Sequence, residues 1–129
     1  MRHKYNKLKQ VDTGIQKSDL VFRNMLTSLV KHGQIKTTPK KAKVLSNTAD
    51  SFFSHLSWLF QKVEDEKEVR RLAINYVKSR VMTDEEWKKV VDELLPKYKE
   101  EGRKSWFTGM YKLWFRKWDW VEEVLVKLI

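Results

Sequence analysis

The chain has 129 residues and a formal net charge of +10, with 41% apolar and 34% charged residues. This length suits one domain with a hydrophobic core, so we treat residues 1–129 as a single domain. The charge predicts a polyanionic partner, with nucleic acid favoured over an anionic membrane. No apolar run approaches the roughly 18 residues of a membrane helix, and the absence of cysteine excludes disulfides and cysteine zinc sites.

Residues 1–17 are polar, basic and without hydrophobic periodicity. We predict a basic N-terminal extension that is ordered by an anionic partner. It begins MRHKYNKLKQ, which lacks the apolar segment of a secretory signal. Residues 1–43 contain eleven Lys/Arg against two acidic residues, a net of +9, whereas residues 44–129 contain sixteen against fifteen, a net of +1. The first third of the chain is therefore the predicted anion-binding region.

The first helix is predicted to begin at Ser18 and Asp19 and to end at Gly33, which suits the left-handed residue that follows many helices. Its apolar residues recur at intervals of three and four, as on one buried helix face. They are Phe22, Met25, Leu26, Leu29 and Val30. The β-branched stretch QIKTT then predicts a short strand. Thr38 and Pro39 suit the N-cap and the first position of the next helix.

Three further helices are predicted before residue 102. The apolar face of the long second helix consists of Ala42, Leu45, Ala49, Phe52, Phe53, Leu56, Leu59, Phe60 and Val63. After the acidic break VEDEKE, the third helix has Val69, Leu72, Ala73, Tyr76 and Val77 on its apolar face. Thr83 and Glu86 have the spacing of a capping box that opens the fourth helix. Pro96 marks the last turn or the end of that helix.

The C-terminal stretch, residues 105–129, is predicted to form a β-hairpin. Residues 106–115 and 120–129 are rich in aromatic and branched side chains, and the turn candidate RKWD lies between them. The predicted order is helix, strand, three helices and two strands. We therefore predict an α+β fold in which a small three-stranded sheet packs with the helices.

The sequence contains no recognisable catalytic or metal-binding constellation. His3, His32 and His55 are scattered, and none has a carboxylate at ligand spacing. The four glycines never cluster into a phosphate-binding loop. The acidic run DEE at residues 84–86 suits a helix N-terminus. We predict no enzymatic activity, no cofactor, no metal and no small-molecule substrate.

Basic residues surround the predicted strand and begin the second helix. The candidate phosphate contacts are Lys36, Lys40, Lys41 and Lys43, together with Arg2, His3, Lys4, Lys7 and Lys9 of the extension. Each neutralised phosphate would release counterions. A solvated charged face is the simpler alternative, but a net charge of +9 in 43 residues favours polyanion binding. Phosphate contacts do not separate RNA from DNA, so a free-standing nucleic-acid-binding regulator is the alternative function to a structural RNA-binding protein.

Two stretches, MRH and FRNMLTSLVKHGQIKTTPKKAKVL, resemble the bacterial large-subunit ribosomal protein seventeen family, and RRLAINY and DELLPKY resemble its third and fourth helices. The resemblance implies a structural, non-catalytic constituent of the cytoplasmic ribosome that binds large-subunit ribosomal RNA beside neighbouring ribosomal proteins. By matching positions it implies RNA contacts at Arg2, His3, Lys4, Arg23, Lys36, Lys41 and Lys43. Residues 5–17 depart from the family, which is richer there in arginine, the better bidentate ligand for phosphate.

Tryptophan is unusually frequent in the predicted hairpin, where KLWFRKWDW contains three. The chain has six Trp and four Gly, the inverse of ordinary usage. At Trp106, Trp114 and Trp118 the family has glycine. The RKWD turn would place Trp118 where tight turns favour positive φ.

Three interpretations of these tryptophans remain open. In the first interpretation, these positions are glycine in the cell, because some bacteria read the codon UGA as glycine whereas other codes assign it to tryptophan. Trp58, Trp87 and Trp120 would then also be glycine. Alternatively, the hairpin is aromatic and packs on the helices. In the third interpretation, its rings form a platform on which nucleic-acid bases stack.

Overall fold

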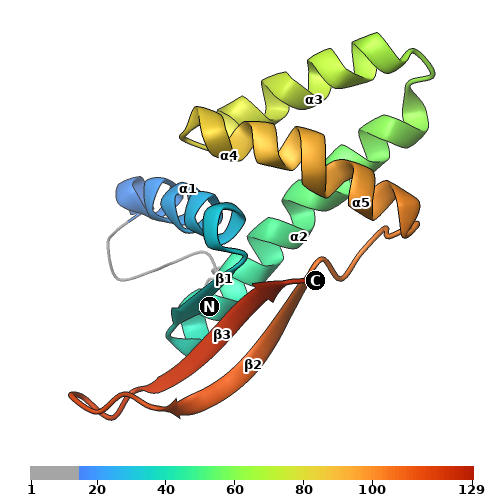
Figure 1. Ribbon diagram of the computed structural model, residues 1–129. Coiled ribbons are helices and arrows are strands. Elements are labelled where there is room, and N and C mark those ends of the chain that lie inside the picture. Colours follow the sequence, from blue (N-terminus) through green and yellow to red (C-terminus); the bar gives the residue numbers. More distant parts are fainter. Residues whose placement is uncertain (1–14) are drawn as a thin grey trace, which may run out of the picture.

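The computed structural model describes residues 15–129, so most of the predicted N-terminal extension lies outside the described residues. The elements are α1 (Ile15–His32), β1 (Gln34–Thr37), α2 (Pro39–Lys62), α3 (Glu66–Arg80), α4 (Asp84–Lys89), the π-helical segment η2 (Val90–Leu94), α5 (Leu95–Glu100), β2 (Thr108–Phe115) and β3 (Glu122–Leu128). Figure 1 shows α4, η2 and α5 as one continuous helical rod. The α+β class and the order of elements are therefore as predicted.

The ends of the first two helices follow the backbone preferences of their residues. Gly33 has φ 77° and its N–H donates to the carbonyl of Leu29 at 2.8 Å, so it ends α1 in the predicted left-handed conformation. Thr38 is the N-cap of α2 and Pro39 begins that helix, although the Thr38 hydroxyl makes no capping hydrogen bond. α1 already includes Ile15, the first described residue, and so starts before the predicted Ser18, because nothing in the stretch IQK interrupts a helix.

The predicted capping box at the fourth helix is not formed. Thr83 is the N-cap of α4, but its side chain makes no capping hydrogen bond. Glu86 is 5% exposed, and its Oε2 has no hydrogen-bond partner among the described residues. Because Glu86 is turned into the protein, its carboxylate does not fold back onto the N-cap residue.

The fourth helix also continues beyond Pro96, to Glu100. The turn before the proline is widened, since the N–H of Leu95 donates to the carbonyl of Val90, five residues back. In a regular helix the proline ring would clash with the carbonyl four residues before it. The π-helical turn relieves that clash, so the helix continues for four residues, about one turn, after Pro96. The proline therefore lies near the last turn of the helix and does not end it.

The three strands form one antiparallel sheet in the order β1-β3-β2. Gln34 pairs with Lys127 and Thr37 with Val124 across β1 and β3. β2 pairs along the other edge of β3, and its register shifts between Lys112 and Phe115, where two residues oppose one. The latest strand in the chain is thus the centre of the sheet.

α2 runs through the middle of the molecule, with the sheet against one part of it and α3 and α5 against the rest (Figure 1). The main core contains most of the predicted apolar helix faces and Val124 and Val126 of β3. At its hairpin end, the ring of Phe107 lies 5.5 Å from that of Phe53 and 5.0 Å from that of Tyr98. This aromatic group joins α2, α5 and the start of the hairpin.

A buried polar contact fixes the base of the hairpin to α2. Asp50 Oδ1 accepts hydrogen bonds from the N–H of Phe107 at 3.1 Å and from Thr108 Oγ1 at 3.3 Å. Ser46 Oγ lies 2.8 Å from the same hydroxyl. Burial raises the pKa of Asp50 above its ordinary value, and the hydrogen bonds only partly offset that effect. The far end of the hairpin extends away from the helices (Figure 1).

Candidate nucleic-acid interface

The structure places four of the predicted lysines where β1 leads into α2, and we call residues 34–43 the basic corner. β1 is an edge strand, and its side chains alternate, so that Lys36 is exposed whereas Ile35 and Thr37 are half-buried. Lys40 and Lys43 are exposed, three residues apart on α2, and Lys41 is half-buried. The sequence prediction for these four residues thus identifies one continuous surface segment.

Arg23 belongs to α1 but lies next to this corner. Phe22 of α1 and Val44 of α2 form a small buried cluster with Met25, and Arg23 and Lys43 are their chain neighbours. The Nε of Arg23 is buried and has no hydrogen-bond partner among the described residues. An external phosphate oxygen could therefore reach the Arg23 guanidinium only through atoms other than this buried Nε.

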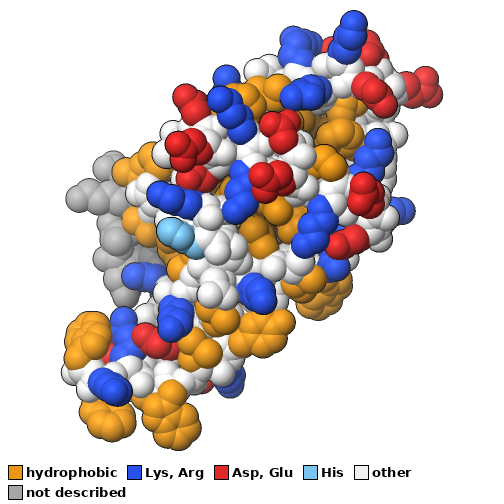
Figure 2. Space-filling view, in the orientation of Figure 1, with side chains coloured by type: hydrophobic (Ala, Val, Ile, Leu, Met, Phe, Trp, Pro, Cys, Tyr) orange, Lys and Arg blue, Asp and Glu red, His pale blue; other side chains and the backbone are white. Residues whose placement is uncertain are grey.

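Within the described part of the chain, no carboxylate forms an ion pair with the positive charges of the corner. The chain has no Asp or Glu between residues 20 and 49, although six Lys/Arg lie there. Within residues 15–129, the ion pairs join Arg70 to Asp92, Arg71 to Glu68, Arg103 to Glu101 and Arg116 to Asp119, so none involves the corner or Arg23. Most carboxylates on the face in Figure 2 gather over α3, α4 and α5.

The sequence interpretation missed one neighbouring cation, Lys31. It is exposed in the last turn of α1, and its carbonyl accepts a hydrogen bond from Lys89 Nζ at 3.2 Å. Lys31 and His32 directly precede Gly33 and β1, so both lie beside the basic corner. Their position at a helix C-terminus, where cations are favoured, also has a structural explanation.

Five predicted contacts, Arg2, His3, Lys4, Lys7 and Lys9, lie outside the described residues. Elsewhere, across residues 15–129, no group of three or more His, Asp or Glu side chains is arranged to hold a metal ion. The helices of the same part of the chain include none that is long and apolar enough to span a bilayer.

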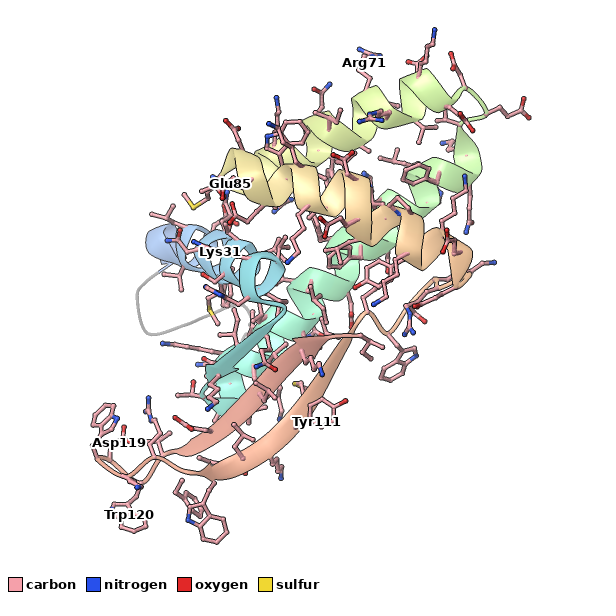
Figure 3. The ribbon with its side chains drawn as sticks, viewed as in Figure 1. Lys31, Arg71, Glu85, Tyr111, Asp119 and Trp120 are labelled. Atoms are coloured by element: carbon pink, nitrogen blue, oxygen red, sulfur yellow. The ribbon has the colours of Figure 1, made fainter. Side chains whose placement is uncertain are left out.

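The end of the hairpin, residues 112–121, is a second cationic surface, which we call the tip. Arg116 and Asp119 form a bidentate pair at 3.1 and 2.7 Å, and Asp119 also accepts from the N–H of Val121. The N–H of Trp120 donates to the Arg116 carbonyl at 2.9 Å and closes the turn. Figure 3 shows the Trp120 ring directed away from the strands. Lys112 and Lys117 are exposed.

The tryptophans of the hairpin do not pack on the helices. Trp106, Trp114, Trp118 and Trp120 are 72–78% exposed, which contradicts the interpretation as a packed aromatic hairpin. In Figure 2 large hydrophobic side chains protrude at the hairpin end. The predicted positive φ at Trp118 is also wrong, because the left-handed conformation is taken two residues later, by Trp120, with φ 56°.

Comparison with known proteins identifies the family. Residues 21–129 match the family described as Ribosomal protein L17. The chain is 33% identical over 109 residues to the large ribosomal subunit protein bL17 of Halothermothrix orenii, covering 84% of this chain and 85% of that protein. The bL17 of Clostridium acetobutylicum is 30% identical over 109 residues, with 84% and 85% covered. That of Clostridium tetani is 33% identical over 110 residues, with 84% and 86% covered.

An α+β fold with a cationic corner fits a structural protein of a ribonucleoprotein. The chain belongs to the ribosomal protein L17 family. It is therefore a ribosomal protein of the large subunit, from a family of structural rather than enzymatic proteins. The match begins at residue 21 and leaves the N-terminal extension out.

Proposed function

We propose that the chain binds large-subunit ribosomal RNA through the basic corner and Arg23, and that the N-terminal extension adds further phosphate contacts. The main support for this proposal is that residues 20–49 contain no Asp or Glu. The lysines of the basic corner, within this stretch, form no ion pair among the described residues. Unpaired lysines on one segment can follow successive phosphates of a backbone.

The start of α2 strengthens this proposal. A helix leaves its first N–H groups without intrahelical partners, and they carry partial positive charge. Here Pro39 occupies the first helical position, and the first intrahelical bond runs from the N–H of Ala42 to the Thr38 carbonyl at 2.9 Å. Lys40 and Lys41 therefore combine backbone donors with side-chain charges where a phosphate can approach.

The extension contributes by charge alone in this proposal. Arg2, His3, Lys4, Lys7 and Lys9 offer phosphate contacts within the first nine residues. Ribosomal RNA orders the extension, and the less basic surface of α3, α4 and α5 remains available to neighbouring ribosomal proteins. The protein then acts at the cytoplasmic ribosome, where it supports translation as a structural component.

Binding to large-subunit ribosomal RNA at increasing salt concentration tests the corner. The variant Lys36→Gln/Lys40→Gln/Lys41→Gln/Lys43→Gln should show a slope of log affinity against log salt that is shallower by about 3 to 4, because each lost phosphate contact removes a little under one unit. The matched control replaces Lys67, Lys88, Lys97 and Lys99 by glutamine, which removes the same charge from α3, α4 and α5.

Equal slopes for the two variants would contradict the proposed interface. Salt-washed large subunits from cells that make the protein provide the second arm of the test. Retention through the wash supports the assignment. Absence from the subunits, combined with sequence-specific binding to isolated duplex DNA, would instead indicate a free-standing regulator.

A further inference from the structure

Two tryptophans of the hairpin occupy backbone conformations that glycine favours. Trp106 has φ 62° and Trp120 has φ 56°, and they are the only non-glycine residues with positive φ within residues 15–129. The other two residues with positive φ in this range are Gly33 and Gly102. A side chain with a Cβ is disfavoured in the left-handed region, and a bulky aromatic one has no local hydrogen bond that could compensate.

The local geometry requires both conformations. Trp120 closes the turn, since its N–H donates to the Arg116 carbonyl and the Arg116 N–H donates to the Val121 carbonyl, both at 2.9 Å. Trp106 directly precedes Phe107, whose ring is fully buried. The left-handed conformation of Trp106 turns Phe107 into the core between the end of α5 and the start of β2. A change of φ at Trp106 would move Phe107, and a change at Trp120 would break the hydrogen bonds of the turn.

Trp114 and Trp118 lie in related places. Trp114 belongs to the bulge between Lys112 and Phe115, where glycine is common because the bulged backbone bends. Trp118 lies inside the turn, and the Arg116 guanidinium lies over its ring at 4.7 Å from the centroid. Together the four tryptophans are 72–78% exposed, although tryptophan is highly buried on average.

A base-stacking platform would explain exposed rings but not the strained backbone. Stacking requires the ring faces, and any φ that presents them would serve. The structure instead places two of the four rings on the conformation least suited to a side chain. Removing all four rings would leave the turn, the bulge, the Arg116–Asp119 pair and the buried Phe107 unchanged.

We propose that residues 106, 114, 118 and 120 are glycine in the protein that the cell makes, because its gene carries UGA at these codons and its translation machinery reads UGA as glycine. The amino-acid sequence has tryptophan at these four positions because it follows a genetic code in which UGA means tryptophan. The tip is then a slender loop of bare backbone with the cations of Lys112, Arg116 and Lys117. This inference goes beyond the proposed function and does not rest on it.

The two helical tryptophans provide the contrast. Trp87 Nε1 donates to Asp84 Oδ1 at 3.0 Å, and its ring receives Lys78 Nζ at 4.7 Å and packs against the core. Trp58 lies within α2, where Lys62 Nζ is 4.5 Å from its ring. Glycine is unfavourable inside a helix. The structural case for glycine therefore covers the four hairpin positions only.

Peptide mass spectrometry on cells that carry the gene tests the proposal. Cleavage after lysine yields peptides spanning residues 105–112, 113–117 and 118–127, which together contain all four positions. We expect every mass to require glycine at 106, 114, 118 and 120, and the gene to have UGA at those codons. Tryptophan at any of the four, or a UGG codon there, overturns the proposal.

The same peptides are followed in salt-washed large subunits and in the ribosome-free fraction. Glycine-containing peptides confined to the free fraction would support this inference and contradict the proposed function. Tryptophan-containing peptides in the subunits would do the reverse. Recombinant chains give an independent arm: Trp106→Gly/Trp120→Gly should melt at a higher temperature than the tryptophan form, whereas Trp58→Gly/Trp87→Gly should melt lower. A lower melting temperature for the first variant would count against the proposal.

Discussion

The basic corner and the tip of the hairpin are both cationic surface segments, yet they relate differently to their own sequences. In the corner every local preference agrees with the backbone: Gly33 takes positive φ, Thr38 caps α2 and Pro39 opens it. In the tip the backbone is equally well defined by hydrogen bonds, but Trp120 stands where a glycine-like conformation is required.

The difference shows that a fold can tolerate a local disagreement when the surrounding contacts determine the backbone. The hairpin is held at its base by Phe107 and along its length by the pairing of β2 with β3. These contacts outside the tip therefore determine the backbone conformation of the tip. The corner has less such support, because β1 is short and lies at the sheet edge. Its residues must therefore favour their own conformation.

A substitution at the base of the hairpin should change the free energy of unfolding most. Phe107→Ala removes a fully buried ring that packs on Phe53 and Tyr98. We expect a loss of about 3–5 kcal/mol in the free energy of unfolding, measured by urea titration. The adjacent Trp106→Ala is the control and should change stability by less than about 1 kcal/mol, since its side chain is exposed. Similar losses for both would show that the hairpin is not anchored by Phe107.

Asp50 links the base of the hairpin to α2, the helix whose first turn belongs to the basic corner. Asp50→Ala should lower the free energy of unfolding by about 1–3 kcal/mol, because the N–H of Phe107 loses its partner in a buried place. Asp50→Asn keeps an acceptor oxygen and should lose much less. Chemical denaturation of the three proteins at one pH measures both effects, and an equal loss for both variants would contradict the hydrogen-bond explanation.

The same carboxyl predicts a pH dependence. Burial raises the pKa of Asp50 above the ordinary value of 3.8, so the folded protein retains this proton at a pH where the unfolded chain has released it. The stability from Asp50 is therefore greatest below pH 3.8 and falls as pH rises toward the folded-state pKa. The stability of Asp50→Asn relative to the parent protein should rise across that interval. A constant difference would contradict the raised pKa.

Relief of strain at the tip should be smaller and of opposite sign. Trp120→Gly should raise the free energy of unfolding by about 1 kcal/mol, since the left-handed conformation costs a residue with a Cβ about 1–2 kcal/mol. Trp58→Gly, within the helix α2, is the control and should lower stability by about 1 kcal/mol. Thermal melting of both variants measures the difference. Destabilisation by Trp120→Gly would indicate that its ring contributes to the fold.

The smallest effect is expected at the N-cap of the corner. Thr38 caps α2 through its backbone conformation and not through its hydroxyl. Thr38→Ala should therefore cost less than about 0.5 kcal/mol, the lower limit for caps that use their side chain. Asp65 of α3 accepts a hydrogen bond from the N–H of Lys67 at 3.1 Å, so Asp65→Ala should cost about 1 kcal/mol. Equal costs would contradict this distinction.

The sequence predicted those features that depend on periodic burial. The apolar faces of α1 and α2, the cap at Gly33 and the hairpin at residues 108–128 follow from spacing and from turn chemistry. It failed where tertiary packing competes with a local motif. Glu86 is drawn inward and does not complete its capping box, and the widened turn at Val90–Leu94 carries the helix past Pro96.

The candidate interface was predictable as charge but not as shape. Lysine spacing identified the corner, and family resemblance identified Arg23. Neither could show that the Nε of Arg23 is buried without a hydrogen-bond partner in residues 15–129, since that depends on how α1 crosses α2. The place of Lys31 beside the corner, by contrast, follows from its position directly before Gly33 and β1. Trp118 lies in the turn as predicted, but the positive φ that was predicted there is observed at Trp120, because the loop length is set by the register of β2 with β3.

The order of the strands has a consequence for the timing of synthesis. β3 is the last of the three to leave the ribosome that makes the chain, yet both β1 and β2 pair only with β3. Gln34 must wait for Lys127 before β1 has a partner. The helices can assemble while the chain is still growing, but the edge strand that carries Lys36 cannot. A nascent chain therefore acquires its complete cationic corner only after nearly all of it has been translated.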